Sequence, residues 1–106
     1  MNDQPNLNYI DELAEGDVAF REKFIGIIKT EFPLEREEYM DHLKNQRFKE
    51  TAMVVHKMKH KFNILSMQEA YGFAVRYEEE LLKGNSSMDS SFKAILQVVD
   101  TYIESI

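Results

Sequence analysis

Apolar residues recur at steps of three and four along nearly the whole chain, which is the spacing of amphipathic helices. The sequence has no stretch in which apolar and polar residues alternate with the period of two that marks a half-buried strand. Glycine and proline number only 4 and 2, so few breaks separate the expected helices. The pattern predicts an all-α fold.

The first half of the chain is expected to contain two helices. A short helix ends at Gly16, because glycine readily adopts the left-handed conformation that closes a helix. Asp17 then offers a side-chain cap for a long helix over residues 18–45. Pro33 lies inside this range, so we expect either one helix bent at the proline or two nearly collinear helices.

The second half is expected to contain three helices, over residues 48–63, 67–83 and 91–105, with Asp89 or Ser90 as the cap of the last one. Their connections are short, and short connections make successive helices antiparallel neighbours. We therefore expect a single domain spanning all 106 residues. Its architecture would be an antiparallel up-down-up-down four-helix bundle with a short additional N-terminal helix.

Composition and charge narrow the classes of function. The absence of cysteine excludes disulfides and thiolate metal sites. No apolar run is long enough to span a bilayer, and the acidic N-terminus is unlike a signal peptide. The net charge of −6 argues against nucleic acid as a partner. We expect a cytoplasmic, monomeric protein that binds neither membrane nor nucleic acid.

The charge is unevenly distributed along the sequence. The segment from position 47 to position 61 has five basic residues and one acid, Glu50: its basic residues are Arg47, Lys49, Lys57, Lys59 and Lys61. Such a segment predicts a basic stripe that docks onto an acidic partner surface, although a charge run can also be a solvated helix face.

Two of the three histidines lie four residues apart in this segment. On a helical wheel its apolar residues occupy one arc, made of Val54, Val55, Met58, Phe62 and Leu65. His56 lies about 150° from the middle of this arc, and Lys59, His60 and Asn63 fall on the same side as His56. These four side chains are expected to share one solvent-facing stripe.

Three interpretations of the histidine pair remain open at this point. Both imidazoles could be ordinary surface residues. Histidines four apart on a helix can also share a zinc ion, with a third ligand from Glu78, Asp41 or His42. The three neighbouring lysines would repel such a dication. The third interpretation is a reactive imidazole, because an exposed neutral imidazole is a nucleophile that flanking ammonium groups could assist in attacking a phosphoryl group.

The sequence has no nucleotide-binding loop of the GxxxxGK[ST] or GxGxxG type, so a phosphoryl group would have to come from another protein. The stretch HKMKHKFNILSM at positions 56–67 resembles the signature of the histidine-containing phosphotransfer (HPt) domains of two-component phosphorelays. The histidine, the apolar Met58, Lys59 and Leu65 match that signature. The preceding long helix with its proline and the later AVRYEEELLKGN also resemble the family.

The resemblance implies a phosphocarrier without catalytic activity of its own. His56 would accept a phosphoryl group from a receiver-domain aspartate and pass it to another receiver, with Lys59 beside it and Glu78 orienting the imidazole. Response-regulator receiver domains and a sensor histidine kinase, of the simple or the hybrid type, would be the partners. The chain would bind no cofactor, and the receiver would supply Mg²⁺. Gly72 would allow close approach of a neighbouring helix.

The sequence departs from the family at three positions. His60 stands where the family usually has glycine, Lys61 replaces a small residue, and Ser66 replaces the glycine of the following turn. His60 could narrow the range of partners, contact the receiver or compete as an acceptor. The departures also leave open a degenerate domain that binds receivers without carrying phosphate.

A docking surface for the receiver is expected around the histidine. Apolar contacts would come from Ala52 and Met53, which lie off the core arc, although partial burial in the core is an equally open interpretation of these two residues. The residues expected to contact a partner are Ala52, Met53, Lys57, His60, Lys61, Asn63 and Gly72.

Overall fold

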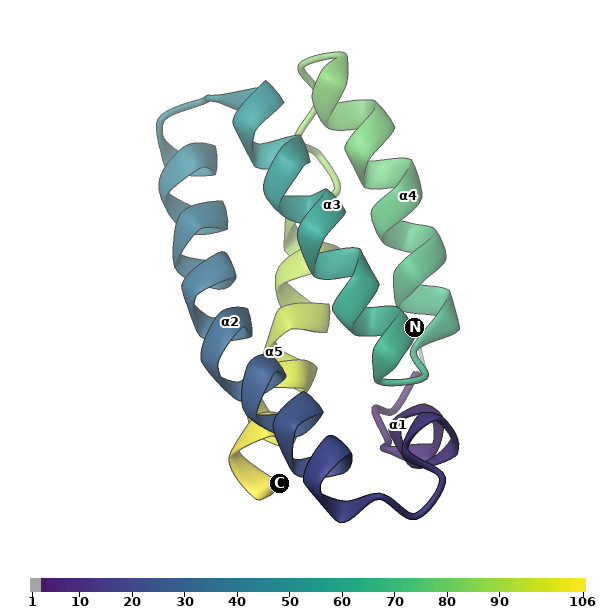
Figure 1. Ribbon diagram of the computed structural model, residues 1–106. Coiled ribbons are helices and arrows are strands. Elements are labelled where there is room, and N and C mark those ends of the chain that lie inside the picture. The colour runs from purple at the N-terminus through teal and green to yellow at the C-terminus, as the bar shows by residue number, and fades with distance from the viewer. Residues whose placement is uncertain (1–2) are drawn as a thin grey trace.

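The computed structural model describes residues 3–106 and is all-α over that range. Its helices are α1 (Asn8–Ala14), α2 (Val18–Lys44), α3 (Phe48–Ile64), α4 (Gln68–Leu82) and α5 (Asp89–Ser105) (Figure 1). The predicted helical class is confirmed. Over these residues, no helix combines the length and apolar character needed to cross a membrane.

α2 begins where the sequence predicts, because the Asp17 carboxylate accepts a hydrogen bond of 3.1 Å from the Phe20 N–H. Gly16 has a φ of +85°, a left-handed conformation that suits glycine. Pro33 lies inside α2 without ending it, and the ribbon of this helix bows along its length in Figure 1. Of the two alternatives, one continuous helix is the one observed.

Two short turns place α3 between its neighbours. The turn over residues 45–47 has Gln46 at a φ of +56°, and the turn over residues 65–67 has Ser66 at +65°. Each turn is closed by a backbone hydrogen bond, from Arg47 to the His42 carbonyl at 2.9 Å and from Met67 to the Phe62 carbonyl at 2.8 Å. Figure 1 shows α3 lying between α2 and α4, with α5 behind them.

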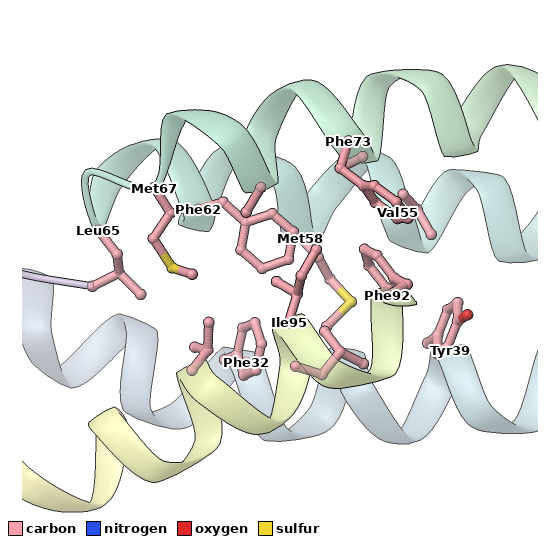
Figure 2. Packing of buried hydrophobic residues seen from close by; sticks show 14 of the residues in the cluster. Phe32, Tyr39, Val55, Met58, Phe62, Leu65, Met67, Phe73, Phe92 and Ile95 are labelled. Atoms are coloured by element: carbon pink, nitrogen blue, oxygen red, sulfur yellow. The ribbon is translucent and has the colours of Figure 1, made fainter. Parts of the chain in front are cut away.

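The core forms where the apolar stripes of the helices meet. Figure 2 shows side chains from α2, α3, α4 and α5 packed together in this region. All five residues of the predicted apolar arc are buried, with exposed fractions of 3% or less: Val54, Val55, Met58, Phe62 and Leu65. The orientation of α3 about its axis is therefore as the helical wheel predicts.

The prediction that Asp89 or Ser90 caps α5 is wrong. The helix begins at Asp89 itself, and no side chain caps its first turn. The Asp89 carboxylate instead accepts a hydrogen bond of 2.6 Å from the Tyr39 hydroxyl of α2, which is also 2.7 Å from the Tyr77 hydroxyl of α4. A buried hydroxyl needs a polar partner, and this tertiary contact takes the carboxylate that the sequence assigned to local capping.

Candidate functional site

His56 lies on the outward face of α3, where its side chain is 58% exposed. Its Nδ1 is 2.7 Å from Oε1 of Glu78 on α4. Because Nδ1 is directed towards α4, Nε2 is the ring nitrogen left for another molecule. The structure thus brings together the histidine and the carboxylate that the family resemblance paired.

Glu78 links His56 to a second cation. Its side chain is 15% exposed, and its Oε2 accepts a hydrogen bond of 2.8 Å from the Lys59 ammonium. Oε1 is buried and forms no hydrogen bond. It lies within hydrogen-bonding distance of Nδ1 of His56, but the two groups are not aligned for a hydrogen bond. A small rotation of the imidazole would supply the partner that a buried carboxylate oxygen needs.

The predicted position of Lys59 on the solvent-facing stripe is wrong. Its side chain is only 10% exposed. The helical wheel gives the direction of Cβ, whereas the flexible lysine stem bends towards α4 and brings the ammonium to Glu78. The same ammonium lies 5.9 Å from the centre of the Tyr71 ring.

Lys61 is buried as well, against α2. Its side chain is 10% exposed, and its ammonium lies 3.0 Å from Glu35 and 2.9 Å from Glu31. Burial lowers the pKa of Lys61, but the hydrogen bonds and charges of the two carboxylates outweigh it and raise that pKa above its usual value. Lys61 is therefore a charged tie between α3 and α2 and does not offer its ammonium to a partner.

The expected basic stripe is not a free positive surface. In addition to Lys59 and Lys61, Lys57 lies 3.1 Å from Glu38 and Arg47 lies 2.6 Å from Asp41. Each of these pairings places a carboxylate beside a basic residue. Counting the charges of positions 47–61 alone did not reveal these pairings, because the paired acids come from other helices or from outside that segment.

His60 and Asn63 remain on the outer side of α3. His60 is exposed, and its ring centre is 5.1 Å from that of His56, with the two rings nearly perpendicular at 80°. Asn63 is half-buried and accepts a hydrogen bond of 3.1 Å from Gln68 at the start of α4. Two exposed imidazoles are thus the side chains that share the outer face of these turns.

An apolar groove of about 590 Å³ adjoins His56 towards the turn between α2 and α3. Met53 of α3 and Leu82 of α4 line it and are 62% and 66% exposed. Its rim includes Glu38, Glu50 and Glu79. Leu82 was missed in the sequence, although the adjacent pair Leu81–Leu82 indicates that only one of the two can face the core.

Two residues that were expected to contact a partner, Ala52 and Gly72, do not lie as predicted. Ala52 lines the groove but is only 5% exposed, so its small side chain belongs mainly to the core. A Cβ at Gly72 would meet only the Arg76 side chain, at 3.9 Å. No helix packs closely against Gly72, and the expectation of a close helix approach there is wrong.

Two of the possible third metal ligands are engaged by another residue. Asp41 and His42 both contact Arg47 near the end of α2, where the His42 Nδ1 accepts a hydrogen bond of 3.0 Å. Within residues 3–106, no group of three or more histidine, aspartate or glutamate side chains is arranged to hold a metal ion.

Comparisons with family models, with curated proteins and with solved structures found no match.

Proposed function

We propose that this protein is a phosphoryl carrier of the HPt type, in which His56 accepts a phosphoryl group from the aspartyl phosphate of one receiver domain and passes it to another. The observation that carries the proposal is the contact of 2.7 Å between Nδ1 of an exposed imidazole and the largely buried Glu78 carboxylate. This contact places the carboxylate beside Nδ1, where a small rotation of the ring would complete a hydrogen bond, and leaves Nε2 outermost.

Glu78 favours the tautomer that the transfer needs. A proton on Nδ1 faces the carboxylate, so the lone pair resides on Nε2. As Nε2 bonds to phosphorus, the bond between phosphorus and the aspartate oxygen breaks and the aspartate leaves as a carboxylate. The proton stays on Nδ1, and Glu78 stabilises the positive charge that the ring gains. The reverse order of events returns the phosphoryl group to a second aspartate.

Lys59 acts in this proposal through Glu78. Its ammonium hydrogen-bonds Oε2 at 2.8 Å and its side chain is 10% exposed, so it holds the carboxylate in place through the oxygen that does not contact His56. A charge-assisted hydrogen bond of this kind fixes the direction of Glu78, and Glu78 in turn fixes the imidazole. The resemblance places Lys59 beside His56 without giving it this role.

The apolar groove beside His56 is the proposed docking surface. Met53 and Leu82 are large, exposed apolar side chains within reach of the reacting imidazole, and such patches favour protein contacts. The receiver would bring the Mg²⁺ and the aspartate, and a sensor kinase would phosphorylate the first receiver. The proposed context is a cytoplasmic, monomeric carrier whose helices form an up-down-up-down four-helix bundle.

The proposal is tested by incubating the protein with a phosphorylated receiver and Mg²⁺ and measuring acid-labile phosphate on the chain. We expect label on the wild type and on His60→Gln, and none on His56→Gln. Label that survives in His56→Gln would refute the assignment. Receiver binding without any label on the wild type would instead identify a module that binds receivers but carries no phosphate.

A further inference from the structure

The two exposed histidines of α3 have the spacing of a metal chelate. Their ring centres are 5.1 Å apart on successive turns. Zinc binds an imidazole nitrogen at about 2.0–2.1 Å, so two imidazoles on one tetrahedral zinc have ring centres roughly 5 Å apart. The observed separation of His56 and His60 therefore needs little change of the backbone to accommodate a shared ion.

The contact behind His56 is the second feature of a metal site. Histidine ligands commonly donate their other ring N–H to a carboxylate, which orients the ring and makes the ligating nitrogen more basic. Glu78 lies 2.7 Å from Nδ1 of His56, and Lys59 holds that carboxylate from its other oxygen. Nε2 of His56 is thereby directed outwards as a ligand.

The structure also weakens the electrostatic objection to a dication. The sequence places Lys57, Lys59 and Lys61 around the histidines, but each ammonium lies within 3.1 Å of a glutamate carboxylate. Lys59 and Lys61 are largely buried, so neither ammonium is directed at the imidazoles from solvent. The repulsion that three free lysines would exert is largely offset.

We infer that His56 and His60 form a two-histidine chelate for Zn²⁺ or a similar transition-metal ion, and that the bound ion excludes phosphoryl transfer to His56. The ion and the phosphoryl group compete for the same lone pair on Nε2. Water completes the coordination, since no third protein ligand is at hand among residues 3–106. Mg²⁺ prefers oxygen ligands and does not compete. The inhibitory half of this inference rests on the proposed function, whereas the metal site does not.

The metal site is tested by isothermal titration of tag-free protein with Zn²⁺ at neutral pH. We expect one Zn²⁺ per chain, and His56→Gln and His60→Gln should each weaken binding by more than about tenfold. Glu78→Gln should weaken it by roughly tenfold, the usual effect of losing an outer carboxylate partner. His42→Gln removes the one histidine outside the pair and should leave zinc binding unchanged.

Equal zinc binding by the wild type and His60→Gln, or binding that needs millimolar zinc, would overturn the chelate. Inhibition is measured separately, as the ratio of phosphoryl label with and without zinc for each variant. Zinc should suppress label on the wild type and much less on His60→Gln; equal suppression of both would overturn the competition. Zinc binding through the pair, without phosphoryl label under any condition, would leave the chelate standing and refute the proposed function.

Discussion

Glu78 is the residue on which the site depends, because its carboxylate lies between an imidazole and an ammonium. Lys59 is 10% exposed and Glu78 15% exposed, so neither charge is well solvated. A poorly solvated charge is tolerated when a partner of opposite sign is close, and removal of one partner leaves the other uncompensated. The same contact therefore serves the stability of the fold and the orientation of His56.

Replacing Glu78 by glutamine should destabilise the protein by about 2 kcal/mol, below the loss expected for a fully buried pair, because Lys59 is left charged and unpaired. The double variant Glu78→Gln with Lys59→Met should regain much of that loss, since methionine keeps the apolar stem without the charge. Urea unfolding of the wild type and of the single and double variants measures both effects. If the double variant loses as much free energy of unfolding as the two single variants together, the two side chains contribute independently.

The orientation of His56 gives a second readout for the same variants. Nitrogen NMR of the imidazole should show the proton on Nδ1 in the wild type and a mixture of tautomers in the double variant. An unchanged tautomer in the double variant would contradict the positioning role of Glu78.

At the scale of elements, the turn between α3 and α4 is under backbone strain at one position. Ser66 has a φ of +65°, which is unfavourable for a residue with a side chain. The turn is nonetheless closed by hydrogen bonds from Ser66 to the Asn63 carbonyl at 3.1 Å and from Met67 to the Phe62 carbonyl at 2.8 Å. The geometry of the turn thus outweighs the preference of the serine backbone.

Replacing Ser66 by glycine should stabilise the protein by roughly 0.5–1 kcal/mol, because the relief of strain exceeds the added flexibility of the unfolded chain. The matched control is Ser91→Gly in α5, where φ is not positive and glycine should be destabilising. Denaturant midpoints of both variants at equal m-value measure the two changes. Destabilisation by Ser66→Gly would mean that the serine side chain has a role beyond its backbone conformation.

The helices and the core face of α3 could be predicted from the sequence because they follow from local spacing. Asp17 caps α2 and Gly16 precedes it as expected, and each residue of the apolar arc is buried. The predictions that failed, for the side chains of Lys59 and Lys61, depend on contacts between helices. The wheel could not show that Lys59 and Lys61 bend towards carboxylates of α4 and α2, because long side chains reach well beyond the direction of Cβ.

The exposure of the two histidines was predicted for the same reason, whereas the pairing of Glu78 with His56 came from the family resemblance. His56 and His60 are exposed, as their position opposite the apolar arc indicates, and Glu78 contacts His56. The docking surface was harder to predict, because Met53 lines the groove as expected but Leu82 comes from a helix far along the chain. Where the groove lies depends on how α3 and α4 pack, and the local pattern does not give this.

At the scale of the whole molecule, a hydroxyl network joins α2, α4 and α5. The Tyr39 hydroxyl contacts Tyr77 at 2.7 Å and Asp89 at 2.6 Å, and the rings of Tyr39 and Tyr77 pack on Phe92 at 4.9 Å and 5.2 Å between centres. Burial raises the pKa of Tyr77 to about 12, and its hydrogen bond with Tyr39 acts against this rise without cancelling it. Burial, and then the bonds to Asp89 and Tyr77, raise the pKa of Tyr39 above its usual range.

The raised pKa values predict how stability changes at alkaline pH. Because the folded state keeps these hydroxyls protonated, their contribution is fully present below about pH 10, the unfolded value. For Tyr77 it is lost as the pH rises from there to about 12, where the folded state also ionises. Tyr77→Phe lacks this titrating group, so its free energy of unfolding should fall less steeply between these pH values than that of the wild type. The stability difference between the two proteins should therefore narrow as the pH rises.

Denaturant unfolding at intervals from neutral pH to strongly alkaline pH measures this difference. Val99→Ala is the matched control, because it removes buried apolar volume from α5 without removing a hydroxyl, and Val99 is fully buried. The free energy of unfolding of Val99→Ala should lie below that of the wild type by the same amount at every pH. That of Tyr77→Phe should instead approach the wild-type value as the pH rises. Parallel curves for wild type and Tyr77→Phe would show that Tyr77 ionises alike in the folded and unfolded states, and Tyr77 would then have no part in the alkaline limit of the fold.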